Sequence, residues 1–234
     1  MLHFLVIVDL GRTGADTIEQ ALPGFDRFGE NCRADGTVAS PTPGGEMADF
    51  LEKLLNASRK ANSLVCVGLD VDPATMPSSV LRRIDPVLSF NKAIIDSTAD
   101  VVCAYKPNLA FYEALGPVGW EILAETLKYI PPDKITIADG KRGDIGHTAK
   151  AYARAVFEVY GFDAVTVNPY LGHDSVQPFL DYTGKGVFVL CKTSNPGSKE
   201  FQDLFVQGAR QDQRPLYQVV ASQVVGWNKN GNCG

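Results

Sequence analysis

From residue 63 onward, short apolar runs alternate with longer stretches in which apolar residues recur every three or four positions. The runs predict five strands, at 63–71, 101–108, 134–141, 164–170 and 186–193. The longer stretches predict helices near 78–98, 111–129, 146–160, 173–182 and 214–226. Regular alternation of strand and helix favours an α/β fold with a parallel sheet, and continuously apolar strands are typical of a sheet covered on both faces.

The first 46 residues differ from the rest of the chain. FLVIVDL predicts one buried strand and ADTIEQAL a short helix, whereas the stretch from Pro23 to Glu46 is rich in Gly and Pro and has no period. Met47 then opens MADFLEKLLNASRKA, an amphipathic helix. We therefore expect residues 1–46 to be an atypical, partly disordered extension and residues 47–234 to form one domain.

Composition narrows the function classes. With 234 residues, 45% of them hydrophobic, the chain can bury a sizeable core. Its net charge of -5 argues against a nucleic-acid or membrane-surface binder. The initial apolar run is short and lacks a basic leader, so we expect neither a signal peptide nor a membrane span. The five cysteines form no C-x-x-C pair, which fits a reducing cytoplasm.

Polar side chains follow the predicted strands at their carboxyl ends. They are Asp70 and Asp72, Lys106 and Asn108, Asp139 and Lys141, Asn168, and Lys192, Thr193 and Ser194. Polar groups gathered at this end of parallel strands are how a TIM (β/α)8-type barrel builds an active site. A doubly wound sheet is the rival fold, but it would favour a Gly-rich phosphate loop, and the chain contains no G-x-G-x-x-G or Walker sequence.

The stretch IADGKRGDIGHTAK, residues 137–150, concentrates charge at the end of one strand. Alternation along a strand places Asp139 and Lys141 on the same face, toward the barrel axis, and Asp144 follows in the next loop. A surface cluster of salt bridges is the competing interpretation. Because Lys106 and Asp70 end neighbouring strands, we favour a partly desolvated network in which pKa values are tuned for catalysis.

The same stretch contains the pattern D-x-K-x-x-D-I-x-x-T and resembles the signature of orotidine 5'-phosphate decarboxylases. Other segments resemble strands of that family in the same order: LVCVGLDVDP, VCAYKPNLAFYE, VTVNPYLGHDSVQPF and VLCKTSNPGSKEF. The resemblance runs from about Met47 to the end of the chain. AYKPN and NPYLGHDS are similar to the bacterial subgroup of the family.

The resemblance implies an enzyme that decarboxylates orotidine 5'-phosphate to uridine 5'-phosphate in pyrimidine biosynthesis, with neither metal nor cofactor. It implies a homodimer with shared active sites, in which one residue of the catalytic array comes from the opposite subunit. The implied catalytic residues are Lys106, Asp139, Lys141 and, from the opposite subunit, Asp144. The implied substrate-binding residues are Asp70 and Thr148 near the ribose, Ser194 near the pyrimidine, and Asn108.

The chain also departs from the family pattern. Only five strand–helix units are evident after Met47, and GWNKNGNCG ends the chain where the family would enter its sixth strand. The family's later loops carry the main phosphate-binding amides and an arginine, and we find no replacement for them. FLVIVDLGRTGADTIEQAL is a candidate to fill one gap in the barrel by permutation. Five open strands would expose a sheet edge unless something covers it.

Two alternatives are also compatible with the sequence. One is a related Mg²⁺-dependent sugar-phosphate barrel enzyme, such as a ketogulonate-phosphate decarboxylase or a hexulose-phosphate synthase. Lys106 on the second strand favours the decarboxylase of orotidine 5'-phosphate over this alternative. The other is an inactive fragment of that decarboxylase.

Overall fold

Parallel strands form the centre of the molecule. The structure, a computed structural model, describes the backbone of residues 6–9, and residues 50–207 and 213–234 in full. One sheet has the order β1-β2-β3-β4-β5-β6, with every neighbouring pair parallel. Its strands are β1 (Val6–Asp9), β2 (Val65–Leu69), β3 (Ala104–Pro107), β4 (Ile135–Arg142), β5 (Ala164–Val167) and β6 (Gly186–Val189). The five strands expected from residue 63 onward are thus confirmed as β2 to β6.

Both edges of this five-strand core are covered by other parts of the chain. β1 runs parallel to β2, in register from Val6 opposite Val65 to Asp9 opposite Gly68. The strand expected in FLVIVDL is confirmed at Val6–Asp9, whereas the helix expected in ADTIEQAL lies outside the described residues. At the opposite edge, Cys233 forms a parallel bridge with Val187. There the N–H groups of Val187 and Val189 donate to the carbonyls of Asn232 and Gly234, at 2.8 and 2.7 Å.

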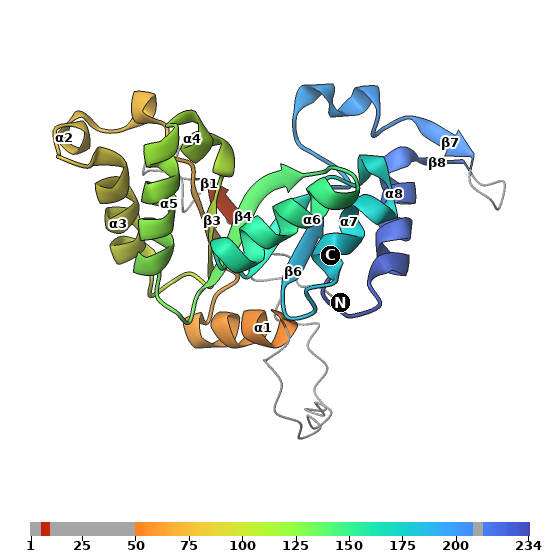
Figure 1. Cartoon of the computed structure of the whole chain (residues 1–234), viewed down its shortest axis with the longest axis horizontal. Helices are drawn as coiled ribbons and strands as arrows, with labels where there is room; N and C mark the ends of the chain where they lie inside the picture. Colours follow the sequence, from red (N-terminus) through yellow and green to blue (C-terminus); the bar gives the residue numbers. More distant parts are fainter. Residues whose placement is uncertain (1–5, 10–49, 208–212) are drawn as a thin grey trace, which may run out of the picture.

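Helices follow the strands along the chain, and most of them pack on the outer face of the sheet (Figure 1). They are α1 (Phe50–Ala61), α2 (Ser78–Leu81), α3 (Pro86–Thr98), α4 (Leu109–Ala114), α5 (Pro117–Tyr129), α6 (Gly146–Arg154), α7 (His173–Leu180) and α8 (Leu216–Trp227). A π-helical turn, Ala155–Val159, continues α6.

Two of the expected helices are split in the structure. The helix expected over 78–98 breaks before α3, because the Asp85 side chain caps a new helix at Leu88 N, with Pro86 in its first turn. The helix expected over 111–129 breaks between α4 and α5. Gly116 there adopts a φ of +69°, which a residue with a side chain rarely does, and Pro117 begins the next helix.

The inner face of the sheet forms a small core of its own. Ile135 and Ile137 pack there with Cys66 and Ala164 from neighbouring strands and with Phe50 of α1. Helix α1 crosses one end of the sheet in Figure 1. The alternation inferred for β4 holds over its first part, where Ile135 and Ile137 lie on the inner face and Ala138 belongs to the core beneath the helices. A register shift between Ala138 and Arg142 interrupts the regular alternation before Lys141.

The outer face is buried under the helices in two apolar clusters. Val67, Leu69 and Tyr105 pack with Ile95 of α3. The larger cluster joins β4, β5 and β6 to α4 through α8, and its fully buried members include Val165, Val176 and Phe179. Burial of this size on both faces explains why the strands read as continuous apolar runs.

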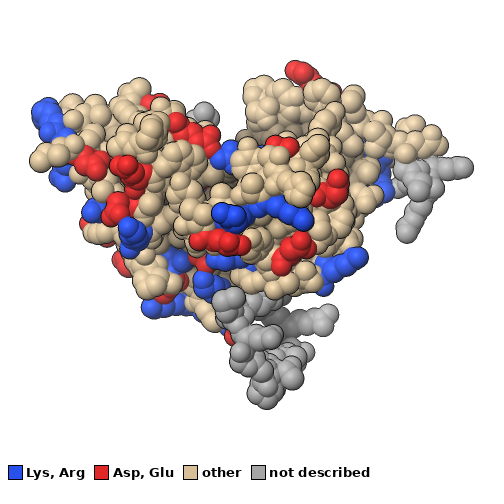
Figure 2. All heavy atoms as spheres, in the orientation of Figure 1, with Lys and Arg blue, Asp and Glu red and all other residues tan. Residues whose placement is uncertain are grey.

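Three further features are a hairpin outside the sheet, the distribution of surface charge, and the length and polarity of the helices. A short antiparallel hairpin, β7 (Phe205–Gln207) with β8 (Gln213–Pro215), extends away from the sheet (Figure 1). On the face shown in Figure 2, basic and acidic side chains are interspersed among the described residues. No helix in the described part of the chain is long and apolar enough to cross a membrane.

Candidate active site

Charged side chains meet on the inner face of the sheet at the carboxyl end of β3 and β4. Lys106 is the third residue of β3, and Asp139 lies on β4 two residues beyond Ile137. Asn108 and Asp139 are paired through a parallel bridge, which sets β3 and β4 in register at this level. Lys106 and Asp139 are both buried, with 7% and 8% of their surface exposed. The sequence therefore places two opposite charges in a desolvated position.

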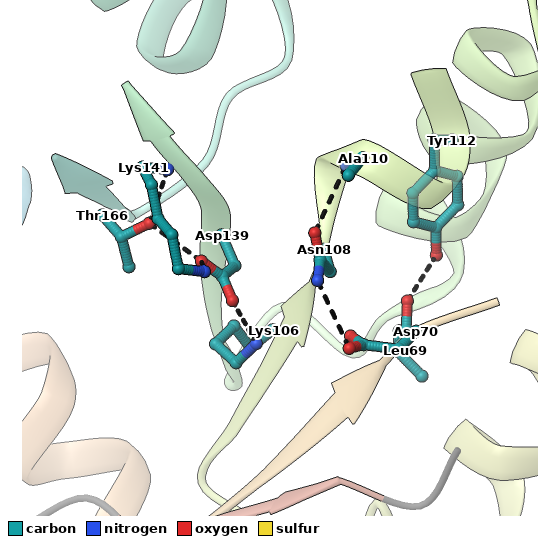
Figure 3. A network of polar contacts seen from close by, with 9 residues as sticks. All are labelled: Leu69, Asp70, Lys106, Asn108, Ala110, Tyr112, Asp139, Lys141 and Thr166. Atoms are coloured by element: carbon teal, nitrogen blue, oxygen red, sulfur yellow. Dashed lines mark hydrogen bonds and ion pairs between the residues drawn. The ribbon is translucent and has the colours of Figure 1, made fainter. Parts of the chain in front are cut away.

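Asp139 is held between two lysines (Figure 3). Lys106 Nζ donates to its Oδ2 at 2.6 Å, and Lys141 Nζ donates to its Oδ1 at 2.6 Å. Each carboxylate oxygen thus accepts a hydrogen bond from a cation, the strong, charge-assisted kind of hydrogen bond. Among these three side chains, two positive charges flank one negative charge.

The ionised form of Asp139 is the stable one in this setting. Burial by itself would raise the pKa of the carboxyl, but the hydrogen bonds and charges of Lys106 and Lys141 outweigh it and lower the pKa below its ordinary value of 3.8. Asp139 is therefore a carboxylate at neutral pH despite its burial. A buried carboxylate of this kind can repel a second carboxylate placed beside it.

Lys141 differs from Lys106 in its access to solvent. Its side chain is 49% exposed, whereas that of Lys106 is 9% exposed. Lys141 can thus face a bound molecule while its ammonium group remains on Asp139. Lys106 lies beneath the pair, where it neutralises the carboxylate.

Asp70 and Asn108 form a second polar pair next to the charged array (Figure 3). Asn108 Nδ2 donates to Asp70 Oδ2 at 3.3 Å, while Asn108 Oδ1 caps α4 by accepting from Ala110 N at 3.3 Å. Behind them, Tyr112 OH donates to the Leu69 carbonyl at 3.3 Å, which fixes α4 against β2. Both residues therefore come from the ends of adjacent strands, as the sequence predicted.

The other three site residues named from the sequence lie in loops or at a helix start. Asp144 follows β4, and its Oδ1 accepts from Ile145 N at 2.8 Å. Thr148 is exposed in the first turn of α6, and Ser194 is exposed in the loop after β6. Within the described residues, none of the three contacts Asp139 or Lys141 through an ion pair or hydrogen bond.

Sequence reasoning missed Thr166 on β5. Its hydroxyl donates to Asp139 Oδ1 at 3.0 Å and accepts from the Lys141 backbone N–H at 2.9 Å (Figure 3). The available signal was alternation, because Thr166 shares the inner face with Ala164 and precedes Asn168 by two residues. A threonine in VTVNPY reads as an ordinary strand residue, so only its neighbours in the sheet reveal the contact.

In the described part of the chain, no group of three or more His, Cys, Asp or Glu side chains is placed to hold a metal ion. The polar side chains at the strand ends are instead lysines, carboxylates, an amide and hydroxyls. Such a set can bind an anionic molecule, stabilise negative charge that develops beside the lysines, and deliver a proton from an ammonium group.

The amino-acid sequence is similar to those of known orotidine 5'-phosphate decarboxylases. The model of the orotidine 5'-phosphate decarboxylase / HUMPS family matches residues 63–229. A curated orotidine 5'-phosphate decarboxylase of Dehalococcoides mccartyi is 56% identical over 185 residues, which cover 79% of this chain and 66% of that protein. The corresponding protein of Herpetosiphon aurantiacus is 47% identical over 186 residues, covering 79% of this chain and 68% of that protein.

Solved structures agree with the sequence relatives. The structure of Leishmania donovani OMP decarboxylase superposes with a TM-score of 0.68 at 40% identity, covering 79% of this chain and 68% of that chain. The parallel sheet with its outer helices is accordingly part of a TIM-type barrel, as the strand-end pattern predicted. The chain spans 66% of the length of the D. mccartyi relative.

Proposed function

The chain belongs to the orotidine 5'-phosphate decarboxylase / HUMPS family, and we propose that it decarboxylates orotidine 5'-phosphate to uridine 5'-phosphate in de novo pyrimidine biosynthesis. One observation carries the proposal: a buried carboxylate, Asp139, lies between Lys106 and the half-exposed Lys141 at 2.6 Å from each. This arrangement suits a reaction in which a substrate carboxylate leaves and a carbanion must be stabilised and protonated.

The first step breaks the bond between the pyrimidine ring and its carboxylate. The electron pair of that bond stays on the ring carbon, and carbon dioxide leaves. Asp139, which is ionised at neutral pH, would sit beside the substrate carboxylate and repel it, whereas the repulsion ends once neutral carbon dioxide forms. The ammonium group of Lys141, beside the ring carbon, would stabilise the carbanion.

The second step is proton transfer. Lys141 Nζ would give a proton to the ring carbon and form the new carbon–hydrogen bond of uridine 5'-phosphate. Its side chain is 49% exposed and so can reach a bound ring, whereas Lys106, at 9%, is too enclosed for that role. Lys106 would instead fix the position and charge of Asp139, and through it that of Lys141. The chemistry we propose needs no metal or cofactor.

The remaining site residues would hold the substrate. Asp70 would bind the ribose hydroxyl groups, with Asn108, joined to it at 3.3 Å beside the array, as a further substrate-binding residue. Ser194 would contact the pyrimidine, and Thr148 would lie near the ribose. These roles follow the family resemblance, and the position of each residue after a strand or at a helix start is compatible with them.

We also propose a homodimer with shared active sites. Asp144 supports the dimer, because its carboxylate forms no ion pair among the described residues. This is unexpected for a residue in a charged loop, only four residues beyond Gly140. In a dimer, Asp144 would enter the site of the partner subunit and lie near Lys141.

Residues 47–234 would form the barrel domain of each subunit. Residues 1–46 would be an extension whose strand β1 lies on the sheet edge.

A reducing compartment, the cytoplasm, suits the proposed enzyme. Cys66, Cys103, Cys191 and Cys233 are all free thiols in the described residues. The proposed substrate is also an intermediate of metabolism.

The test is turnover of orotidine 5'-phosphate by the 234-residue chain, followed by ultraviolet absorbance in the presence of EDTA. Turnover that persists with EDTA and disappears in Lys141→Ala would support the proposal. Turnover that EDTA abolishes would favour a Mg²⁺-dependent member of the family. If a cooperatively folded chain shows no turnover, the proposal is wrong for this chain, and the alternative of an inactive portion of the decarboxylase stands.

A further inference from the structure

Lys141 has an unusual backbone for a residue with a long side chain. Its φ is +46°, and among the described non-glycine residues only Asn62 also has a positive φ. The left-handed region is disfavoured for a residue with a side chain, because Cβ approaches the following carbonyl oxygen. It persists only where surrounding contacts impose it, and such residues gather at functional sites.

The strained residue lies where the sheet changes register. Ala138 of β4 is opposite Val165 of β5, but the next paired residue is Arg142, opposite Val167. The four-residue step on β4 thus corresponds to two residues on β5, and Lys141 lies inside the bulge. A bulge of this kind re-aims a side chain near an active site. Here it directs Lys141 back to Asp139.

Thr166 is the residue of β5 that faces this bulge. Its Oγ1 accepts from the Lys141 backbone N–H at 2.9 Å and donates to Asp139 Oδ1 at 3.0 Å. The same Oδ1 accepts from Lys141 Nζ at 2.6 Å. The contacts close a ring through the Lys141 backbone, the Thr166 hydroxyl, the Asp139 carboxylate and the Lys141 ammonium group (Figure 3).

The directions of these hydrogen bonds are determined by chemistry. An ionised carboxylate only accepts and a backbone N–H only donates, so the single hydroxyl proton of Thr166 must point to Asp139 and a lone pair must face Lys141. Of the side-chain groups in this ring, only a hydroxyl can donate to the Asp139 carboxylate and accept from the Lys141 N–H at the same time. A methyl group of the same size would serve neither.

We propose that Thr166 is a positioning residue for the reaction: its hydroxyl holds the backbone bulge at Lys141 so that the ammonium group stays on Asp139. The inference rests on the proposed function for its effect on turnover, but its geometric part stands without it. Thr166 itself would touch neither the reacting atoms nor the substrate. It acts through the two residues that do.

The variants that test the proposal are Thr166→Val, which keeps the volume and removes the hydroxyl, and Thr166→Ser, which keeps the hydroxyl. Thr183→Val, at an exposed turn position, is the matched control. We expect Thr166→Val to lower kcat by roughly tenfold or more while KM changes by less than about threefold, because the lost contacts orient reacting groups. Thr166→Ser should recover most of the activity.

A second readout does not depend on turnover. The ¹³C signal of the Asp139 carboxyl, followed by NMR against pH, should show a higher midpoint in Thr166→Val than in the wild-type chain, since a donor to the charged form is lost. Thr166→Ser and Thr183→Val should keep the wild-type midpoint. If Thr166→Val fails to fold, Thr166→Ala is measured in its place, with the same expectation.

The two failures are distinguishable. An inactive wild-type chain rejects the proposed function, and the carboxyl titration then decides the positioning role alone. An unchanged Asp139 midpoint in Thr166→Val or Thr166→Ala overturns the proposal. So does an active enzyme in which Thr166→Val keeps its kcat, or one in which Thr166→Ser is as slow as Thr166→Val.

Discussion

Lys106 and Asp139 form a buried ion pair across the neighbouring strands β3 and β4, with 2.6 Å between Nζ and Oδ2. Removing Asp139 would leave Lys106 as an unpaired buried charge, which typically costs about 3–5 kcal/mol. Removing Lys106 would leave Asp139 paired with Lys141 alone. Lys141, which also binds Asp139 and is more exposed than Lys106, is the member of this network that can contact a ligand.

Lys141→Ala should abolish decarboxylation in any active form of the chain. The variant loses both the stabilising charge and the proton donor, so we expect kcat to fall by roughly 10³-fold or more. Lys150→Ala is the matched control, since Lys150 is exposed on α6 in the same charged stretch. Comparable rates for the two variants would contradict the role given to Lys141.

Asp144→Ala and Lys141→Ala should rescue one another when mixed. If each site takes Asp144 from one subunit and Lys141 from the other, a mixed dimer contains one site with both residues intact. Random exchange of subunits in a twofold dimer then returns about a quarter of the wild-type rate. Turnover is measured after the two inactive proteins have been mixed and allowed to exchange. No recovery despite demonstrated exchange would count against a shared site.

Acid should weaken the fold through Asp139. Because the pKa of this carboxyl is lower in the folded chain than the ordinary 3.8, its ionised form contributes stability that is present above about pH 4. That contribution is lost as the pH falls through the folded-state pKa. Urea unfolding measured from pH 6 down to pH 3 should therefore show a steeper loss for wild type than for Asp139→Asn at the acid end. Parallel curves would mean that other carboxyls account for the acid sensitivity.

Phe50→Ala should destabilise the fold strongly. Phe50 is 4% exposed, stacks edge-on against Phe188 at 6.1 Å, and fills the space beside Gly186, where an added Cβ would come within 2.4 Å of its ring. We expect a loss of about 3–5 kcal/mol in the free energy of unfolding, as for other buried Phe-to-Ala changes. Leu51→Ala, on the exposed side of α1, should cost less than about 1 kcal/mol. Equal losses would show that α1 does not close the inner core.

Cys66 should be inert in the folded chain. Burial raises the pKa of its thiol to about 12, and its exposed fraction is 0%. Peptide mapping after iodoacetamide treatment at pH 8 should show Cys191, which is partly exposed, labelled well before Cys66. Unfolding in guanidinium should remove the difference. Rapid labelling of Cys66 in the native chain would indicate that the inner face of the sheet opens.

The sequence by itself determined the parts of this protein that depend on local pattern. Continuous apolar runs specified β2 to β6, since strands buried on both faces carry no polar alternation. Asp139 and Lys106, at the ends of neighbouring strands, predicted the charged array that the structure brings together. Lys141 was correctly expected in it, although a bulge rather than regular alternation brings it there. Asp70 and Asn108 were found in the same way.

Tertiary structure decided what depends on pairing between distant segments. The placement of Val6–Asp9 beside β2, and of Asn232–Gly234 beside β6, follows from hydrogen bonds across sequence gaps that no local pattern encodes. Thr166 became part of the site only because a bulge shifts β4 against β5. A bulge and a register shift are set by the packing of whole strands, so the residues that it unites cannot be read from either strand alone.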